Sequence, residues 1–416
     1  MITKKRKYAV DKRVTGGSKR ILIPTIKNKT KKRNTKYSQT YNYYSATEFY
    51  PDKYIEGLFT SRGNWNRITK DELKTTKKPI HFMYINGKYY LEKYHYNVHV
   101  KLKNVISESR NIVSDKSSLI HELSKYPAAR KYILETHDIN AQIIMNKPSI
   151  LHKYKRLFNV LTNQQNGTSP KKIYILKPVS GYAGANIDII TTYDEFVNKM
   201  NMHIKKWGKG WRSGSNYYKK WVLQEYLTEP LLFKESGSLE SDKKEFKFHL
   251  RHYFIFRPGS KHSFFLKKGL MATGLKPYVK GDWLNKDIHD THFHGLEGEK
   301  FPSALNLSPG IIHKLYKQLY ELYSFINKIL KAHGQCYAES HNCFEVFGAD
   351  LMITKDYNIK ILEFNSSPGL GYEDNEYVPD EKKSVIENIM SVIVDEYFPP
   401  AKTVNNPFTD DIVFVK

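Results

Sequence analysis

Three polar residues near the C-terminus have the types and the spacing of a magnesium site. Asp350 lies in an apolar run, and Glu363 and Asn365 lie in a second run after the polar turn 354–358. The two runs predict a β-hairpin, and side chains two apart on a strand share a face. Glu363 and Asn365 then point the same way, and Asp350 joins them if the register is regular. Two carboxylates and an amide oxygen are hard ligands that Mg²⁺ accepts while it bridges triphosphate oxygens.

A solvated face on an edge hairpin is the simpler interpretation of acidic residues in strands. The runs 343–353 and 359–365 are too apolar for such a face. Two buried carboxylates side by side would also be costly without a cation between them. The exit from the second strand, Asn365-Ser-Ser-Pro-Gly369, is also a distinctive sequence rather than an ordinary turn. We therefore favour a metal site.

A lysine followed by two glycines is a second candidate for phosphate contact. Lys177 lies near the end of a predicted strand over 172–179, and Gly181 and Gly184 follow it. Glycines let backbone N–H groups approach phosphate oxygens, and a lysine supplies a mobile charge. A glycine-containing hairpin is more often only a turn. The pattern therefore indicates a phosphate contact only in combination with the carboxylates described above.

Two long cations share one face of another predicted strand. Lys247 and Arg251 lie four residues apart within 246–256, so both point to the same side. Cations inside an apolar strand need anionic partners, and a phosphate or an acyl phosphate would supply one. Two surface cations that extend into solvent explain the strand equally well when it is taken alone.

A histidine-rich segment contains His289, His292 and His294. Imidazole nitrogens bind transition metals, but no cysteine lies near these residues in the sequence. We favour polar lining of a substrate or nucleotide pocket, or plain surface histidines, over a metal site.

The composition is that of a globular chain with a basic excess. The 416 residues have a formal charge of +25, with 40% hydrophobic and 14% aromatic residues, and this length allows two or three domains. Residues 1–45 lack hydrophobic periodicity and contain fourteen lysines and arginines with one acid. They predict a disordered basic arm, which fits a solvated tail, nuclear targeting or nucleic-acid contact alike. The excess outside the arm favours an acidic partner.

The two cysteines, Cys336 and Cys343, are too few for a disulfide framework. We expect small buried thiols and a reducing compartment. No apolar run has the length of a membrane span, and the start of the chain lacks the apolar core of a secretory leader. These features predict an intracellular protein, cytoplasmic or, through the arm, nuclear.

The remaining elements place these motifs in successive regions. Strand 80–85, the turn Asn86-Gly87 and strand 88–93 predict a β-hairpin with a type I′ turn. Polar residues at 114–118 predict the start of a helix that ends near 126, and two further helices are predicted over 309–334 and 380–397. The predicted parts are the basic arm 1–45, an N-terminal accessory α/β domain 46–165, a central subdomain 166–245, a C-terminal subdomain 246–398 and a tail 399–416.

The order of the motifs resembles the tubulin–tyrosine ligase family of ATP-grasp ligases. The resemblance covers about residues 110–397, and the last pair of motifs is the most specific. The matching segments are Ser114-Asp-Lys116, Leu176-Lys-Pro-Val-Ser-Gly-Tyr-Ala-Gly184, Val222-Leu-Gln-Glu-Tyr-Leu-Thr-Glu-Pro-Leu-Leu232, Lys247-Phe-His-Leu-Arg251, Cys343-Phe-Glu-Val-Phe-Gly-Ala-Asp350 and Leu362-Glu-Phe-Asn-Ser-Ser-Pro368.

The resemblance implies an α+β ATP-grasp fold in which two α+β subdomains clamp ATP. It also implies a monomeric, ATP- and Mg²⁺-dependent carboxylate–amine ligase. Such an enzyme adds a free amino acid to a carboxylate of an acidic polypeptide, such as a tubulin tail, through an acyl phosphate. Two alternatives stay open: an ATP-grasp ligase for a small molecule or a different protein, and a nucleic-acid-binding protein with an inert ligase core.

Residue by residue, the resemblance implies that Asp350, Glu363 and Asn365 hold magnesium. Arg251 faces the reacting phosphoryl group, and Lys177 and Glu363 complete the catalytic set. The implied nucleotide contacts are Lys116, Lys177, Gly181, Gly184, Gln224, Glu225, Leu227, Lys247, Lys267 and His292.

Three positions depart from the family pattern. An aspartate expected between the lysine and the arginine is His249, an arginine of the next strand corresponds to Lys267, and a Thr-Asn pair becomes Thr291-His292. These departures lie near the amino-acid pocket, so they leave the identity of the substrate open.

Overall fold

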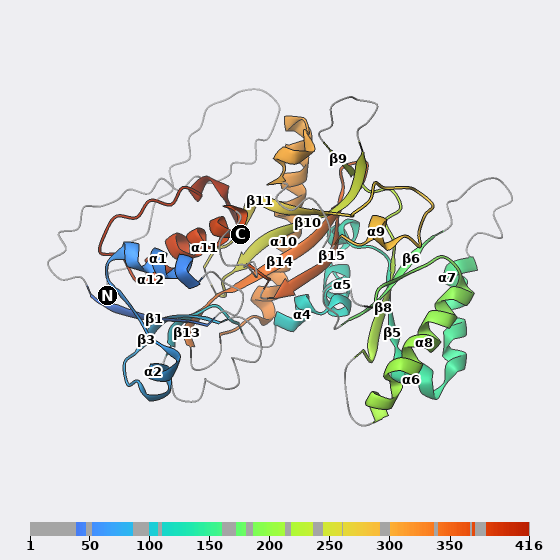
Figure 1. Cartoon of the computed structure of the whole chain (residues 1–416), viewed down its shortest axis with the longest axis horizontal. Helices are drawn as coiled ribbons and strands as arrows, with labels where there is room; N and C mark the ends of the chain where they lie inside the picture. Colours follow the sequence, from blue (N-terminus) through green and yellow to red (C-terminus); the bar gives the residue numbers. More distant parts are fainter. Residues whose placement is uncertain are drawn as a thin grey trace. The chain divides into compact units, whose positions relative to one another are not determined.

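Three β-sheets organise the chain in the structure, a computed structural model (Figure 1). All described residues belong to one compact unit within Asn34–Lys416. The structure describes residues 39–46, 52–85, 100–106, 110–159, 172–179, 186–212, 218–235, 244–259, 261–291, 300–336, 340–366, 368–370 and 380–415.

The N-terminal sheet is parallel throughout, with the strand order β13-β4-β3-β1-β2. Strand β1 lies within the last part of the predicted arm, so that part belongs to the fold. Both edges of β3 pair with parallel strands, β1 and β4, so the predicted antiparallel hairpin is wrong. Its turn, Asn86-Gly87, and residues 88–93 lie outside the described residues. The elements are β1 Tyr41–Ala46, α1 Asp52–Arg62, β2 Trp65–Arg67, α2 Lys70–Thr75, β3 Ile80–Ile85, β4 Val100–Lys103 and β13 Ser340–Cys343.

The two cysteines are not free thiols, because a disulfide joins Cys336 to Cys343 with their Cα atoms 5.5 Å apart. Cys336 forms a β-bridge with Ile106, and Cys343 pairs with Lys103 in β4. The chain around β4 therefore brings together two cysteines that the sequence alone leaves unrelated. The expectation of buried thiols is wrong. The prediction of a reducing compartment was based on these two cysteines, so they no longer support it.

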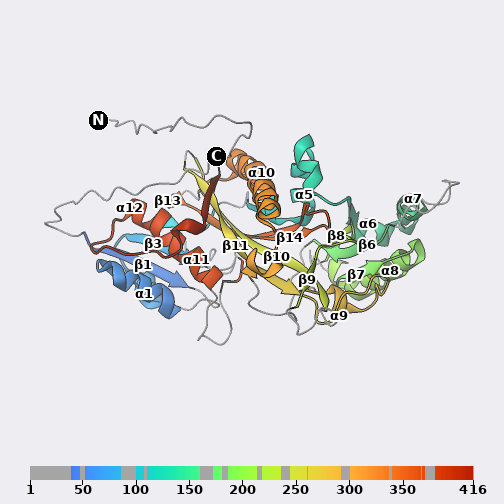
Figure 2. The ribbon, with the colours of Figure 1, turned by 90° about the horizontal axis from the view of Figure 1, so that it is seen from above.

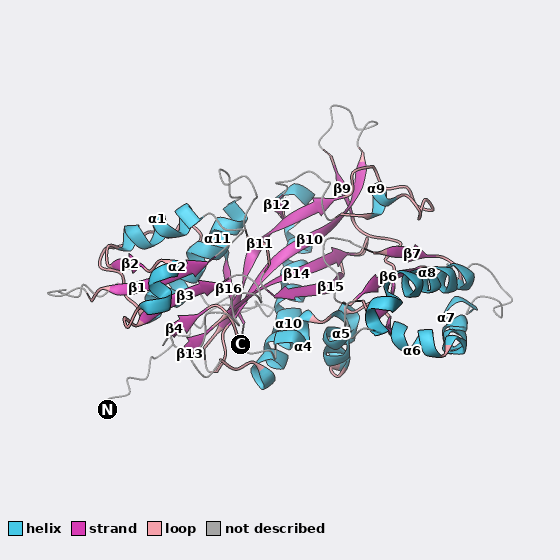
Figure 3. Cartoon of the chain, turned by 60° about the horizontal axis from the view of Figure 1, so that its bottom comes forward, coloured by secondary structure: helices cyan, strands magenta, loops and turns pink. Residues whose placement is uncertain are grey.

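The central sheet is antiparallel, with the order β5-β8-β6-β7. Strand β5 comes from the region predicted as the N-terminal domain, so the sheet joins segments that the predicted boundary at residue 165 separates. Helices α6 and α8 pack on one face around Trp221 and Phe196 (Figure 3). The elements are β5 Thr136–Asn140, α6 Ala141–Asn146, a 3₁₀ segment Pro148–Tyr154, α7 Lys155–Asn159, β6 Tyr174–Pro178, β7 Asp188–Ile190, α8 Tyr193–Arg212 and β8 Lys220–Glu225.

The C-terminal sheet has the order β12-β11-β10-β14-β15, with β9 on β10 and β16 on β11. Because β16 lies within 399–416, the predicted tail is part of this sheet. The strands are β9 Leu232–Lys234, β10 Glu245–Phe256, β11 Ser263–Thr273, β12 Lys300–Phe301, β14 Glu345–Ile353, β15 Ile359–Ser366 and β16 Ile412–Val415.

Helices cover both faces of the C-terminal sheet (Figure 2). Helix α10 begins at Pro309 behind the cap Ser308, and α5 begins behind Asp115, whose carboxylate accepts from the N–H groups of Ser117 and Ser118. Both helix starts agree with the sequence. The helices and turns are α4 Asn111–Ser114, α5 Lys116–Ser124, α9 Lys286–His289, α10 Pro309–His333, α11 Asp380–Ile389, a π-helical turn Met390–Val394, α12 Asp395–Tyr397 and the 3₁₀ segments Pro127–Tyr132, Ser303–Leu305 and Thr409–Asp411.

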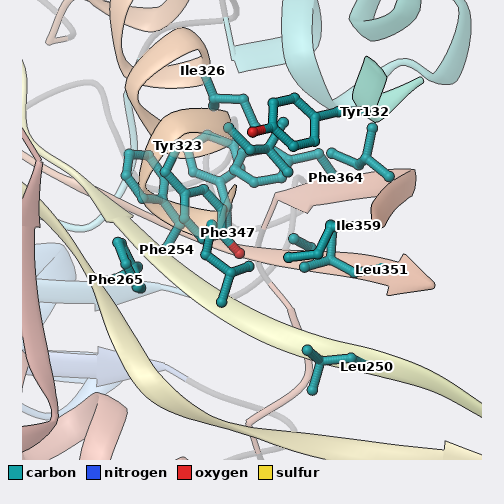
Figure 4. Packing of buried hydrophobic residues seen from close by; sticks show 14 of the residues in the cluster. Tyr132, Leu250, Phe254, Phe265, Tyr323, Ile326, Phe347, Leu351, Ile359 and Phe364 are labelled. Carbon is teal, nitrogen blue, oxygen red and sulfur yellow. The ribbon is translucent and has the colours of Figure 1, made fainter. Parts of the chain in front are cut away.

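Alternation along β10 separates an aromatic core from a polar wall. Phe248, Leu250, Phe254 and Phe256 belong to the core that contains α10. In this core Phe254 stacks on Tyr323, with ring centroids 5.1 Å apart (Figure 4). Residues at the intervening positions point to the opposite face, since side chains alternate along a strand.

That opposite face has two parts. Tyr253 and Ile255 pack with α11 and with residues of the N-terminal sheet, and the earlier positions carry the polar residues described next. No helix in the part of the chain that the structure describes combines the length and apolar character needed to cross a bilayer.

Candidate active site

The predicted β-hairpin is formed by β14 and β15, and Asp350 pairs with Glu363. The register shifts between Asp350 and Leu351, which pairs with Ile361. This irregularity changes which side chains share a face. Ile359 and Ile361 lie in the α10 core, whereas Glu363, two residues further on, lines a cavity on the other side.

Asp350, Glu363 and Asn365, here called the hairpin triad, converge in the structure. The Asn365 amide nitrogen lies 2.8 Å from Glu363 Oε1 and 3.4 Å from Asp350 Oδ2. Asp350 is only 2% exposed. Amide oxygen and nitrogen can exchange places by rotation, so Asn365 can also present its oxygen beside the two carboxylates.

Arg251 holds Asp350 through two hydrogen bonds. Its Nε and Nη2 donate to the two carboxylate oxygens, the second over 2.9 Å. Burial disfavours the charge of Arg251, but the attraction of Asp350 outweighs it and raises the pKa of the guanidinium. The side chain passes over Gly348, where a Cβ atom would lie 3.0 Å from Arg251 Cδ and 2.8 Å from Pro368 Cβ. A glycine is therefore needed beneath the arginine.

Two lysines approach Glu363 from the other side. Lys116, at the start of α5, has its Nζ 3.2 Å from Glu363 Oε2 and 3.3 Å from the Val179 carbonyl oxygen. Lys177, in β6, donates to Gln224 Oε1 over 2.9 Å and points toward the Leu362 carbonyl oxygen at 3.4 Å. Burial lowers the pKa of Lys177 to about 8, although Glu363 opposes the shift.

Lys247 is buried, and its ammonium group contacts neutral oxygens. Its Nζ lies 2.8 Å from the Tyr226 hydroxyl and 3.2 Å from the His289 carbonyl oxygen. Burial lowers its pKa to about 7, and Asp290 only partly opposes this. His249, between Lys247 and Arg251 on the same face, forms a 2.6 Å hydrogen bond with Thr291.

The electrostatics of the hairpin triad fit a divalent cation. Burial and the neighbouring Glu363 raise the pKa of Asp350 to about 6, despite Arg251. Burial acts in the same direction on Glu363, but Lys116 and Lys177 hold its pKa well below the usual range. A metal between the two carboxylates would remove their repulsion. The buried lysines would then face the anionic groups of a ligand.

Eight of the predicted residues line a cavity of about 230 Å³ between the central and C-terminal sheets. Its apolar wall includes Ile175, Met352 and Leu362, as a nucleobase would require. Arg251 and Asn365 contact Asp350 but are not among the lining residues. The predicted residues that line the cavity are Lys116, Lys177, Gln224, Glu225, Leu227, Lys247, Asp350 and Glu363.

Lys267 does not line this cavity, and its role as a nucleotide contact stays a prediction. Its Nζ donates to the Asp410 carbonyl oxygen over 2.6 Å, beside the start of β16. The strand register instead places Ala272 opposite His249 and Leu270 opposite Arg251. Gly181, Gly184 and His292 lie outside the described residues.

His289 supplies polar lining of the cavity, as one of the two favoured interpretations predicted, whereas His292 and His294 lie outside the described residues. His289 Nδ1 lies 2.7 Å from the Tyr226 hydroxyl, and Nε2 lies 2.8 Å from the Asp282 carbonyl oxygen. Both ring nitrogens are therefore used. Within the described ranges, no group of three or more His, Cys, Asp or Glu residues is arranged to hold a metal.

Sequence reasoning missed Tyr226, Trp283 and Asp188 as lining residues. Trp283 lies in a loop whose polar residues gave no periodic signal. Asp188 pairs with Lys199 over 2.8 Å and with His203 over 2.9 Å, across a strand and a helix. Only the fold brings these residues together.

A family model described as "Tubulin-tyrosine ligase family" matches residues 88–296 and 311–405. The chain belongs to the tubulin–tyrosine ligase family. The match includes both strands of the hairpin, the cation-bearing strand β10 and the central sheet.

Curated relatives of this family are distant in sequence. "Probable tubulin–tyrosine ligase PBY1" of Saccharomyces cerevisiae is 23% identical over 68% of this chain and 43% of its own length. "Probable tubulin–tyrosine ligase C12B10.04" of Schizosaccharomyces pombe is 21% identical over 61% of this chain and 64% of its own length. "Probable tubulin polyglutamylase ttll-9" of Caenorhabditis elegans is 25% identical over 48% of this chain and 46% of its own length. The chain thus spans less than two thirds of each of these relatives.

Proposed function

We propose that this protein is an ATP- and Mg²⁺-dependent ligase of the ATP-grasp type, which joins an amino acid to a carboxylate of an acidic polypeptide. The observation that carries the proposal is the hairpin triad, whose Asp350 and Glu363 line one cavity together with the buried Lys177 and Lys247. Membership of the tubulin–tyrosine ligase family supports it, as does the naming of relatives as tubulin–tyrosine ligases and a tubulin polyglutamylase.

The hairpin triad would hold magnesium, which neutralises charge on the transferring phosphoryl group when it is bound. Lys177 and Lys116 would contact the phosphates. The apolar wall beside Gln224 and Leu227 would receive the base. Arg251, fixed by Asp350 over Gly348, would stabilise the developing charge on the phosphoryl oxygens.

In the proposed reaction, a carboxylate oxygen of the acceptor attacks the γ-phosphorus of ATP. The bond to the β–γ bridging oxygen breaks, which gives an acyl phosphate and ADP. The amine of the incoming amino acid then attacks the acyl carbon, inorganic phosphate leaves, and the amine releases a proton. Lys177 and Arg251 would stabilise negative charge in both steps.

The acceptor is proposed to be acidic because the chain is basic. Its formal charge of +25 would raise the rate of encounter with a tubulin-like acidic tail through electrostatic steering. Increasing salt should therefore lower the rate of productive association.

Intact mass measurement tests the proposal directly. The protein is incubated with ATP, Mg²⁺, an acidic polypeptide and each amino acid in turn. The expected result is a mass gain of one or more residues that depends on ATP and on one class of amino acid. The absence of any mass gain, together with the absence of ADP formation, would refute the proposed function.

A further inference from the structure

Exposed apolar side chains gather on one loop at the mouth of the cavity. The large hydrophobic residues that the described structure exposes most are Ile143, Met202, Leu275, Val279 and Leu284. Scattered examples are ordinary on protein surfaces. However, three of these five lie within the loop 274–285, and such a concentration marks an interaction site.

The loop is held in place by hydrogen bonds to the surrounding structure. Its backbone N–H groups at Gly274 and Tyr278 donate to the carbonyl oxygens of Lys247 over 2.9 Å and Glu245 over 2.7 Å. The Tyr278 hydroxyl donates to the Thr228 carbonyl oxygen over 2.8 Å. A Cβ atom at Gly274 would lie 2.6 Å from the Ile288 carbonyl oxygen, so the two ends of the loop approach closely. A surface fixed in this way loses little conformational entropy when a partner binds.

The loop borders two cavities. Trp283 and Leu284 line the proposed active site, and Trp283 also lines a second cavity of about 940 Å³. The indole ring stacks on His289, with ring centroids 5.7 Å apart. Val279 and Leu275 are about half exposed, at 53% and 50%, and neither lines the proposed active site.

Positive charge accompanies the apolar surface. The second cavity is lined by Lys131, Lys280, Lys355 and Lys360 but only two acids, Glu229 and Asp356. Glu229 is shared by Lys280, at 3.1 Å, and Lys355.

Lys276 in the loop pairs with Asp287 over 2.7 Å, and Lys131 pairs with Glu321 over 2.9 Å, but two other lysines near the loop have no such partner among the described residues. Lys360 donates to the Lys131 carbonyl oxygen over 2.8 Å, and Lys286 makes no ion pair with any residue that the structure describes. Exposed ion pairs such as Lys280–Glu229 contribute little energy, so an acidic ligand can replace them.

We propose that the loop 274–285, together with Lys280 and Lys286, is the docking surface for the acceptor polypeptide. The fitting partner is an acidic segment with an aliphatic or aromatic side chain near its acceptor carboxylate. The apolar side chain would cover Leu275, Val279 and Leu284, and the flanking carboxylates would face the lysines. This inference rests on the proposed function and specifies how that ligase selects its acceptor.

Fluorescence anisotropy with two labelled peptides tests the docking surface in the full chain. One peptide is a glutamate oligomer, and the other contains a central leucine in the same sequence. Leu275→Ser/Val279→Ser should weaken binding of the leucine-containing peptide about tenfold, as loss of about 1.4 kcal/mol would require. The matched control is Ile143→Ser/Met202→Ser, whose residues have similar exposures of 49% and 48% on α6 and α8. It should leave binding unchanged.

Charge is tested separately with Lys280→Ala/Lys286→Ala. This variant should weaken both peptides to a similar extent and reduce the dependence of binding on salt. Equal affinity of the wild type and the Leu275→Ser/Val279→Ser variant for the leucine-containing peptide would overturn the proposal. An equal loss in the Ile143→Ser/Met202→Ser control would overturn it as well. If the loop variants weaken binding of a single-stranded RNA oligonucleotide but not of either peptide, the partner is a nucleic acid and the proposal is wrong.

The docking surface and the ligase activity can fail independently. Loop-dependent peptide binding without any mass gain would refute the ligase and retain the surface. A mass gain whose KM for the acceptor is the same in the wild type and in Leu275→Ser/Val279→Ser would retain the ligase and refute the surface.

Discussion

The two sheets that line the cavity hold their charges in different ways. On the C-terminal sheet, the carboxylates of Asp350 and Glu363 already have cationic partners, Arg251 and Lys116. On the central sheet, the contacts of Lys177 with described residues are to neutral oxygens, those of Gln224 and Leu362. The C-terminal wall therefore has two paired carboxylates beside the buried Lys247, and the central wall has a buried cation whose pKa burial lowers to about 8.

This difference shows what kind of ligand suits the cavity. A lone anion would satisfy Lys177 but would be repelled by the hairpin triad. A lone metal would suit the hairpin triad but would be repelled by the lysines. A metal–polyphosphate complex would satisfy both walls, because it would present positive charge to one sheet and negative charge to the other.

The largest effect is expected from Glu363→Gln, which removes the charge that faces Lys116 without changing the shape of the side chain. We expect ligase turnover to fall by about 10³-fold, the upper part of the range for loss of one preorganised charge contact. ADP release measured at saturating ATP and Mg²⁺ checks this. The control is Asp356→Asn, which removes an exposed acid from the turn of the same hairpin. Full activity of Glu363→Gln would contradict the role of the hairpin triad.

A smaller effect is expected from Gly348→Ala, which would displace Arg251 without removing it. The new Cβ atom would approach Arg251 Cδ to 3.0 Å, and a displaced catalytic group loses about 10²-fold in rate. The measurement is a double-mutant cycle with Arg251→Ala. If Gly348 acts by positioning Arg251, its substitution should have little further effect in the Arg251→Ala background. Additive losses would show that Gly348 acts by another route.

The third prediction concerns the pH dependence of nucleotide affinity, which Lys177 on the central-sheet wall should control. Titration of one group changes the affinity by at most about tenfold per pH unit. Burial lowers the pKa of Lys177 to about 8. The side chain is therefore positively charged below that pH and loses its charge as the pH rises through it. Nucleotide affinity of the wild type should therefore fall between about pH 7 and about pH 9, roughly one unit on either side of that pKa. Equilibrium dialysis against labelled nucleotide measures the affinity. Lys177→Arg keeps its charge and should show a flatter profile, and identical profiles would exclude Lys177 from phosphate binding.

Lys247 offers the mildest test, because it lies on the C-terminal sheet and its ammonium group contacts neutral oxygens. Its folded-state pKa of about 7 lies below the unfolded value. Between these two values the unfolded chain binds more protons, so the stability of the free protein should rise with pH across this window. Lys247→Met should raise the Tm at pH 6.5 by a few degrees, as about 1 kcal/mol does for a domain of this size. A lower Tm for this variant would contradict the unfavourable burial of the charge.

Much of the hairpin could be predicted from its sequence, because each strand has a local signature. The apolar runs around Asp350 and Glu363 predict two strands, and the polar turn between them predicts their pairing. The register shift next to Asp350 could not be predicted. Strict alternation would place Ile361 and Glu363 on one face, whereas the structure places them on opposite faces.

Pairings between distant segments also could not be predicted from the sequence. Nothing local indicates that β13 adds to the N-terminal sheet, or that β5 belongs with β8. The same limit explains the wrong expectation for Cys336 and the unforeseen position of Lys267. The partner of each residue, Cys343 or the Asp410 carbonyl oxygen, is selected by the packing of other strands. The cations of β10 were predictable because they share one strand and one face.

The most direct test of the account is calorimetric titration of a non-hydrolysable ATP analogue with and without Mg²⁺. The wild type is compared with Asp350→Asn/Glu363→Gln, which keeps the lysines of both walls. We predict that Mg²⁺ strengthens binding to the wild type by at least about tenfold, a gain of about 1.4 kcal/mol, and that this gain disappears in the variant. Equal strengthening by Mg²⁺ in both proteins would contradict a metal site at the hairpin triad.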